Sequence, residues 1–314
     1  MRIVSLFAVF VIILFCAQPV QAQINKDYSF LLCPQFGFFY GHIEEIVYPP
    51  SGNKADLLSL LLWDIKPVFY YGFLMDFSPV NPMGRWGLFS SLSMKYGIPG
   101  LSGSMEDKDW LLAEYAGITN YSTHDNITKE IFLLDFSAGF SFPVRNTFLI
   151  KSFVNISYML FRFSGENGYG IYALINPPQY SFNGMGTVIS YRQEWFCIAP
   201  GISVGYGYDG YLTAEISFII TPLVFCADLD EHKGRNIQFR ENMTGGVMLE
   251  PGLRLFLDLS KRLGISCDIS WRYISGTRGL TYRRPIGIGN YKQEGEAGAG
   301  LSILNTALLL KVKL

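Results

Sequence analysis

The sequence predicts an all-β protein, a closed antiparallel ten-stranded transmembrane β-barrel. Three observations lead to this prediction: an export signal at the N-terminus, long segments in which apolar and polar residues alternate, and a composition rich in aromatic residues but poor in charge. Of the 314 residues, 49% are hydrophobic, 16% are aromatic and 16% are charged. After the export signal no run of about 18 apolar residues remains, so no membrane-spanning helix is indicated.

Residues 1–22 are expected to be a secretory signal peptide. Arg2 supplies the positive charge at its start, residues 3–16 are an almost unbroken apolar run, and Ala22 ends a cleavage site of the small-x-small type. No linker, composition break or low-complexity tract interrupts the rest of the chain. Residues 23–314 are therefore expected to form a single transmembrane β-barrel domain.

Alternation is clear in residues 131–142, IFLLDFSAGFSF. One face carries only apolar side chains, four of them phenylalanines, and the other carries Ile131 and Leu133 followed by Asp135 and small residues. After the turn PVRN the pattern resumes from Phe148, so the two segments predict a β-hairpin. These strands exceed the usual length of about five or six residues. Long strands with one aromatic-rich and one polar face are typical of outer-membrane barrels, whose sheet must close because lipid cannot satisfy an open edge.

Counting the alternating segments gives the topology. Strands are expected at residues 28–48, 58–77, 87–103, 128–142, 147–165, 187–206, 211–226, 245–259, 264–275 and 297–314. Short turns are expected near residues 78–86, 143–146, 207–210 and 260–263, and longer polar loops near residues 49–57, 104–127, 166–186, 227–244 and 276–296. Short periplasmic turns and long outer loops are the usual asymmetry of such barrels.

Two acidic clusters follow predicted strands. Asp107 and Asp109, in SGSMEDKDWL, follow the third strand, and Asp230 and His232, in DLDEH, follow the seventh. In an extended segment, residues i and i+2 point the same way, so each pair can act together. The strand count places both pairs on the outer rim, where they would face each other across the mouth of the barrel.

Such a set suits the activation of water. An imidazole oriented by a carboxylate, here His232 beside Asp230, can act as a general base near neutral pH. Two adjacent carboxylates cannot easily both ionise, so they can share a proton and hold a water molecule. The residues alone also fit a solvated acidic loop or a weak calcium site. Zinc is disfavoured, because His232 is expected to be the only histidine near either cluster.

Several other functions find little support. The motif GISVG around Ser203 matches the serine-hydrolase pattern, but it lies inside a predicted strand with no strand–turn–helix around it. The net charge of −1 gives no reason to expect nucleic acid as a partner. The cysteines fit no metal motif and are expected to be small apolar strand residues rather than a disulfide framework; they are Cys33, Cys197, Cys226 and Cys267.

The two acidic segments resemble those of the omptins, outer-membrane proteases built as ten-stranded barrels. SGSMEDKDWL resembles the segment around the omptin aspartate pair, and DLDEHKG resembles the Asp–x–His segment. Weaker matches run in order along almost the whole mature chain: EIVY at 45–48, SLLLW at 59–63, ISYRQEW at 189–195 and GAGLS at 298–302. The resemblance implies an omptin-like barrel and an aspartic endopeptidase of the outer membrane.

Carried over by position, the resemblance assigns catalytic roles. Asp230 and His232 match the catalytic dyad, and Asp107 and Asp109 match the opposing aspartates. The implied reaction is attack by a water held between the two pairs, with His232 as the base and no covalent acyl-enzyme. The active site is implied to be formed by the extracellular loops and to face the cell exterior.

Substrate preference also follows from the resemblance. Glu45 and Asp228 match acidic residues that bind the basic side chain before the scissile bond, so cleavage is implied next to or between basic residues. An acidic rim would attract cationic peptides or proteins, the implied substrates. No cofactor and no metal is implied. Omptins typically depend on lipopolysaccharide, but Asn167 falls about where a basic lipid-binding residue is expected, which leaves dependence on outer-membrane lipid open.

Two alternatives stand beside the protease: a non-catalytic outer-membrane barrel that acts as an adhesin or host-protein binder, and a passive pore. The presence of all four catalytic positions favours the enzyme, since an adhesin needs none of them. Predicted inward residues such as Arg254, Asp268 and Arg272 carry both signs, which indicates a closed ion-pair network rather than a channel. Ten strands also leave little free lumen.

Overall fold

The computed structural model describes residues 22–23, 27–49, 57–79, 81–111, 117–145, 147–173, 178–207, 212–260 and 263–312. The predicted signal peptide, residues 1–22, lies outside these residues except for Ala22, which begins the short strand β1 (Ala22–Gln23). Nearly all regular structure in the described part of the chain is β-strand; the exception is a single 3-10 turn, η1 (Lys233–Arg235).

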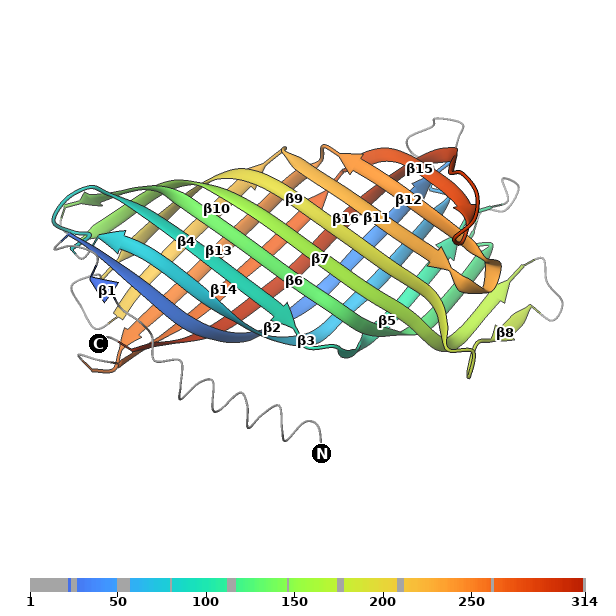
Figure 1. Ribbon diagram of the computed structural model, residues 1–314, viewed down its shortest axis with the longest axis horizontal. Helices are drawn as coiled ribbons and strands as arrows, with labels where there is room; N and C mark the ends of the chain where they lie inside the picture. The colour runs from blue at the N-terminus through green and yellow to red at the C-terminus, as the bar shows by residue number, and fades with distance from the viewer. Residues whose placement is uncertain are drawn as a thin grey trace.

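The strands form one antiparallel ring, as predicted (Figure 1). The ring closes where the last strand pairs with the first long one, from Glu296↔Tyr48 to Leu309↔Gln35. Six positions in the ring are continuous strands: β2 (Tyr28–Tyr48), β3 (Ser59–Pro79), β6 (Asn120–Val144), β7 (Phe148–Tyr172), β9 (Thr187–Tyr206) and β16 (Lys292–Val312).

The other four positions are each split into two strands. They are β4 (Gly87–Gly97) with β5 (Gly100–Asp109), β10 (Leu212–Thr221) with β11 (Val224–His232), β12 (Ile237–Thr244) with β13 (Val247–Asp258), and β14 (Leu263–Ser275) with β15 (Arg278–Pro285). Every break contains a residue that interrupts a β-ladder: Pro99, Pro222, Gly245 and Gly246 at positive φ, or Gly276 at positive φ. A three-residue strand, β8 (Gln179–Ser181), pairs with the outer end of β7.

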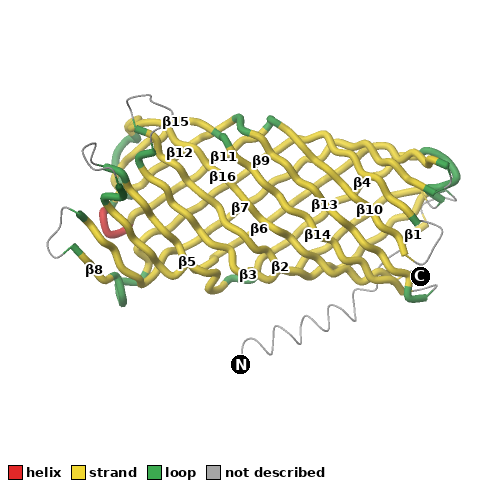
Figure 2. Tube along the Cα trace, turned by 180° about the vertical axis from the view of Figure 1, so that it is seen from behind, coloured by secondary structure: helices red, strands yellow, loops and turns green. Residues whose placement is uncertain are grey.

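The predicted outer loops are wrong in extent. Much of residues 104–127, 166–186, 227–244 and 276–296 is strand, and β6 pairs with β7 as far out as Asn120↔Tyr172. Beyond the lipid-facing part the outer face is no longer uniformly apolar and the inner face is no longer uniformly polar. The hydropathy contrast that marks a strand in the sequence therefore weakens, although the backbone ladder continues. The tube view shows these long tilted strands extending to the end that carries η1 (Figure 2).

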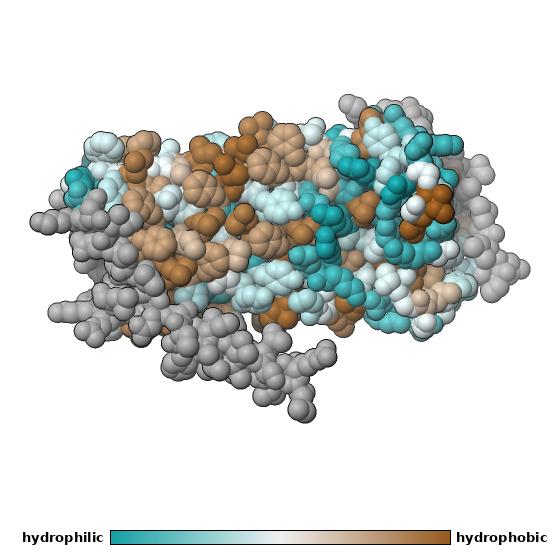
Figure 3. All heavy atoms as spheres, in the orientation of Figure 1, coloured by the Kyte–Doolittle hydropathy of each residue, from teal (hydrophilic) through white to brown (hydrophobic). Residues whose placement is uncertain are grey.

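A belt of apolar side chains surrounds one part of the barrel. Exposed aromatic and aliphatic residues gather there, and the surface changes to polar residues toward the end that carries β8, β12 and β15 (Figure 3). Arg162–Glu130 and Arg192–Glu194 form ion pairs on the outer surface beyond the belt. The belt includes Phe136, Phe140, Val154, Ile156, Phe196, Ile202, Val204, Ile216, Phe218, Leu253, Leu255, Ile269 and Leu308. Within the described residues, no helix has the length and apolar character needed to cross a membrane.

Ion pairs cross the interior at the level of the belt. Arg272 binds Asp135 at 2.7 Å and Glu250 at 2.6 Å, and it thereby links β14 with β6 and β13. Arg254 and Asp268 form a second pair at 2.6 Å. These contacts confirm the predicted network of mixed charge, and a cavity of about 190 Å³ lies among its polar side chains.

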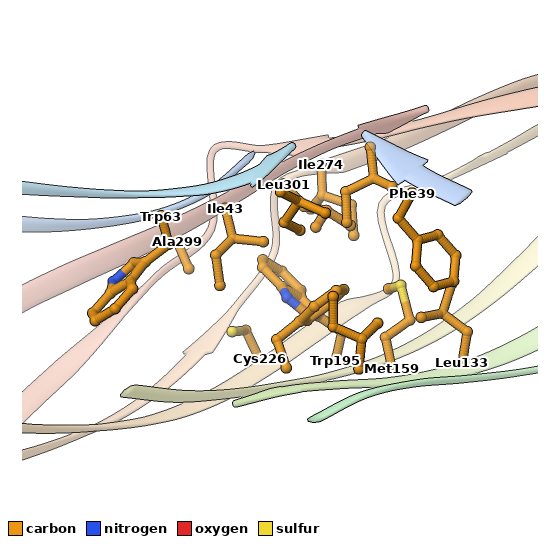
Figure 4. Close-up of a cluster of buried hydrophobic side chains, with 14 of the residues drawn as sticks. Phe39, Ile43, Trp63, Leu133, Met159, Trp195, Cys226, Ile274, Ala299 and Leu301 are labelled. Atoms are coloured by element: carbon orange, nitrogen blue, oxygen red, sulfur yellow. The ribbon is translucent and has the colours of Figure 1, made fainter. Parts of the chain in front are cut away.

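Apolar side chains fill the barrel between this network and the outer end. Phe39, Trp63, Met159 and Trp195, on β2, β3, β7 and β9, belong to one buried cluster. In Figure 4, side chains from both sides of the barrel point toward one another and meet in the interior. We call this cluster the apolar plug. It separates the interior ion pairs from the outer end of the barrel, which argues against a passive pore.

Arg272 is expected to be essential for the stability of the barrel. Arg272→Met leaves Asp135 and Glu250, with side chains only 15% and 12% exposed, without their cation. Removing one partner of a buried pair costs about 3–5 kcal/mol. Arg283→Met is the control, because its pair with Glu294 is about half exposed and should contribute at most about 1 kcal/mol. Urea unfolding of the refolded protein in detergent measures both; equal losses would contradict this account of the interior.

Candidate active site

Strand β11 carries three of the candidate site residues in succession. Its inward residues alternate from Cys226, in the apolar plug, through Asp228 and Asp230 to His232, and all four are buried. The sequence interpretation placed these residues in a loop beyond the strand, which is wrong: Asp230 pairs with Tyr191 of β9 and with Phe239 of β12. A rigid ladder on both sides therefore holds the Asp–x–His segment.

Asp230 and His232 form a direct pair. His232 Nε2 lies 2.5 Å from Asp230 Oδ2. The Arg235 guanidinium, in turn η1, contacts His232 Nδ1 and lies 3.2 Å from Nε2. An Nδ1 that accepts from a guanidinium leaves the imidazole proton on Nε2, directed at Asp230. The carboxylate can then orient the ring and stabilise its protonated form.

Asp107 and Asp109 lie on the inward face of β5, again on a strand rather than in a loop. Asp107 pairs with Leu61 of β3 and Ser122 of β6, so its position is set from both sides. Asp109 Oδ2 accepts a hydrogen bond from Asn120 Nδ2 at 3.2 Å. The predicted arrangement, in which both aspartates share one direction, is thus met by the strand geometry.

A β-bulge sets the direction of the side chains in this part of β5. The register with β6 shifts between Leu101 and Ser104, and Gly103 there has φ +102°, a backbone conformation that favours glycine. Asp64 of β3 accepts hydrogen bonds from Ser104 N at 3.1 Å and Ser104 Oγ at 2.8 Å. A Cβ on residue 103 would lie 2.7 Å from Asp64 Cβ, so the bulge requires glycine.

The two pairs act on each other electrostatically. Burial raises the pKa of Asp107 from 3.8 to about 7, and repulsion from Asp109 adds to the rise. The positive charges of His232 and Arg235 act in the opposite direction and lower the pKa of Asp107. The two pairs are therefore close enough to interact across the barrel mouth. Burial and the charge of Asp107 also raise the pKa of Tyr172, which ends β7 beside the aspartate pair. Near neutral pH Asp107 therefore exchanges a proton easily.

One layer deeper, three carboxylates meet. Glu45 of β2, Asp228 of β11 and Glu241 of β12 each contribute an oxygen to a group whose members lie within 4.8 Å of one another. We call these residues the three-carboxylate cluster. Burial is the largest cause of the raised pKa of each of them, and repulsion from neighbouring carboxylates adds to the rise. The sequence interpretation identified Glu45 and Asp228 but missed Glu241, because only the register Asp228↔Glu241 between β11 and β12 brings it inward.

A chain of hydrogen bonds ties this cluster to the plug. Trp195 Nε1 donates to Gln193 Oε1 at 2.8 Å, and Gln193 Nε2 donates to Tyr191 Oη at 2.8 Å. Tyr191 Oη donates to Asp228 Oδ2 at 3.1 Å. These hydrogen bonds fix the position of the Asp228 carboxylate and connect the three-carboxylate cluster to the apolar plug.

Comparison with known proteins identifies the family. The omptin family model matches residues 27–313. The chain belongs to the omptin family. No curated protein sequence shows significant similarity to it. Omptins are outer-membrane proteases, and family membership makes this chain an outer-membrane protease in general terms.

Solved structures give the same fold. The barrel is similar to the outer membrane protease OmpT of Escherichia coli, with a TM-score of 0.78 and 15% identity over 93% of this chain and 98% of that one. A FadL homologue of Pseudomonas aeruginosa matches 92% of this omptin and 90% of its own chain at 9% identity, but its TM-score of 0.25 carries no argument. At sequence identities this low, the structural matches are evidence for the fold alone.

Other residues considered in the sequence have structural places. His124 is buried on β6, where it pairs with Met105 two residues before Asp107, so His232 is not the only histidine near the clusters. Burial lowers the pKa of His124, whose Nδ1 lies 2.6 Å from the Asn167 carbonyl oxygen. Ser203 lies within β9 as expected. The four cysteines of the described chain are free, and Cys267 alone is exposed.

The raised pKa of Asp107 predicts a pH dependence of stability. A carboxyl whose pKa rises on folding contributes stability that is full below about pH 4 and is lost as the pH rises through about 7. Asp107→Asn should therefore flatten the fall in melting temperature between pH 5 and pH 8. Asp125→Asn, an exposed residue on β6, is the control. Parallel pH profiles for wild type and Asp107→Asn would contradict the buried, protonatable state of Asp107.

Proposed function

We propose that this omptin is an endopeptidase that cleaves cationic peptides or proteins next to or between basic residues. A water molecule held between the Asp230–His232 pair and the Asp107–Asp109 pair would be the nucleophile. The observation that carries the proposal is the 2.5 Å contact of His232 with Asp230, opposite an aspartate whose pKa is raised to about 7. A base and a proton-holding carboxyl thus meet at the mouth of a closed barrel.

The proposed reaction assigns one task to each group. His232 takes a proton from the water as its oxygen attacks the scissile carbonyl carbon, and Asp230 stabilises the resulting imidazolium. Asp107 and Asp109 share a proton and hold the water in place. The proton on His232 then passes to the leaving amine, so that hydrolysis is complete without a covalent intermediate.

Specificity is assigned to the deeper acidic layer. Glu45 and Asp228 are buried carboxylates below the proposed water, and a planar guanidinium forms strong paired hydrogen bonds with such groups. The strands that carry the site, β5, β11 and β12, reach toward the end of the barrel opposite β1 (Figure 1), which lies beyond the apolar belt (Figure 3). We propose that this end faces the cell exterior, because the longer connections of outer-membrane barrels lie on that side.

Cleavage is tested with refolded protein and a quenched peptide that contains paired basic residues. His232→Ala and Asp230→Asn should each lower kcat/KM by roughly 10²–10⁴-fold, because each removes the general base or its orientation. Parallel assays with and without lipopolysaccharide test whether lipid is required. Asp125→Asn should retain activity. A wild-type kcat/KM in both site variants would refute the mechanism. Binding of the peptide by the wild-type protein without cleavage would favour an adhesin.

Arg235 should restrain the reaction. Its guanidinium covers His232 Nδ1, the nitrogen left free for base catalysis while Nε2 is directed at Asp230. Arg235→Ala is therefore expected to raise kcat/KM several-fold at neutral pH. Lys233→Ala, in the same turn but paired with Glu231, is the control and should change little. A loss of activity in Arg235→Ala would instead make Arg235 a contributor to catalysis.

A further inference from the structure

The three-carboxylate cluster contains more negative charge than its surroundings balance. Glu45, Asp228 and Glu241 are 2%, 4% and 0% exposed. Glu45 Oε2 has no hydrogen-bond partner among the described residues. Asp228 and Glu241 interact with each other, and the Thr281 hydroxyl interacts with Glu241, but none of these contacts brings in a positive charge. The ion pairs found in the described part of the chain involve none of the three.

Buried carboxylate oxygens without partners are costly unless a cation or protons neutralise them. The groups that act most strongly on Glu45 are all acidic: Glu241, Asp230, Asp228 and Asp107. Tyr191 satisfies only Asp228 Oδ2. The remaining oxygens converge on one another, and convergence of this kind is the arrangement that a cation requires.

We propose that Glu45, Asp228 and Glu241 form a binding site for a hard divalent cation of the Ca²⁺ class. Ca²⁺ binds oxygen at about 2.3–2.6 Å, so oxygens around one ion lie up to about 5 Å apart. The three ligand oxygens, all within 4.8 Å of one another, meet this condition. The Thr281 hydroxyl lies opposite Glu241 on β15 and interacts with its carboxylate, and it is a further oxygen donor.

Glu241 distinguishes this site from a site for a basic side chain alone. A guanidinium carries one positive charge, and Glu45 with Asp228 already exceeds it. A third carboxylate favours an ion of higher charge, and carboxylate oxygens favour hard cations over soft ones. The metal and a substrate arginine would compete for the same oxygens. This last consequence, inhibition of cleavage by the cation, rests on the proposed function, whereas binding of the cation does not.

Terbium luminescence tests the site directly. Tb³⁺ replaces Ca²⁺ and emits when a nearby aromatic residue is excited. Tyr191 Oη lies 3.1 Å from Asp228 Oδ2, and the Trp63 ring stacks on the Tyr191 ring at 5.4 Å. Refolded protein in phosphate-free detergent, without lipopolysaccharide, is titrated with Tb³⁺ under excitation of tryptophan. We expect saturable emission that Ca²⁺ displaces.

Variants assign the emission to the cluster. Glu241→Gln and Glu45→Gln should each weaken Tb³⁺ binding at least tenfold. Glu106→Gln, on the outer face of β5 and paired with Lys108, is the control and should bind like the wild type. Circular dichroism establishes that each variant is folded, and an unfolded Glu241→Gln is replaced by Glu241→Asp, for which binding should be measurably weaker.

Three results would overturn the proposal: no saturable emission from the wild type, no displacement by Ca²⁺, or equal affinity in the folded Glu241 and Glu45 variants. The peptide assay is separate. A wild-type protein that cleaves no basic peptide yet binds Tb³⁺ through Glu241 would refute the proposed specificity and support the cation site. A protein that cleaves such peptides but binds no Tb³⁺ would do the reverse.

Discussion

Closure of the sheet between β2 and β16 is the constraint on which the rest of the molecule depends. Lipid offers no hydrogen bonds, so a sheet can cross the membrane only if it has no free edge. Once the ring is closed, the two-residue period of every strand divides its side chains into an outer and an inner set. The outer set forms the apolar belt, and the inner set becomes a stack of layers inside a tube.

The order of these layers explains the chemistry of the site. Ion pairs around Arg272 occupy the interior at the level of the belt. The apolar plug follows toward the outer end of the barrel, and the acidic residues lie beyond the plug. The plug supplies a dry floor, and burial is the largest cause of the raised pKa values of Asp107 and Glu45. A histidine and an aspartate on opposite walls can therefore share proton chemistry that the same residues in an open loop would lose to solvent.

The sequence was sufficient for the barrel but only for part of the site. Period-two alternation revealed the ten positions of the ring because lipid requires a strong contrast between the two faces of a strand. Beyond the belt that contrast weakens, so the pattern predicts loops where the structure has strands. Glu241 and Arg235 were missed for the same reason: Glu241 becomes a site residue only through its register with Asp228, and Arg235 only through the turn that folds it back onto His232. Short motifs identify residues that lie close in the chain, whereas cross-strand partners depend on register.

The buried carboxylates at this end of the barrel destabilise the fold, and interactions elsewhere in the barrel must offset that loss. Each buried, unpaired carboxylate lowers the stability of the folded state, and such groups persist where the surrounding structure holds them in place. Here β2, β11 and β12 hold Glu45, Asp228 and Glu241 on paired strands, and the chain from Trp195 to Tyr191 supports Asp228 from below. A structural role alone would favour apolar residues at these positions, as in the plug one layer down. A site kept acidic against that preference fits the cation proposed above, a basic side chain or a metal ion, and while no cation is bound, protons on the carboxylates with raised pKa values neutralise part of the charge.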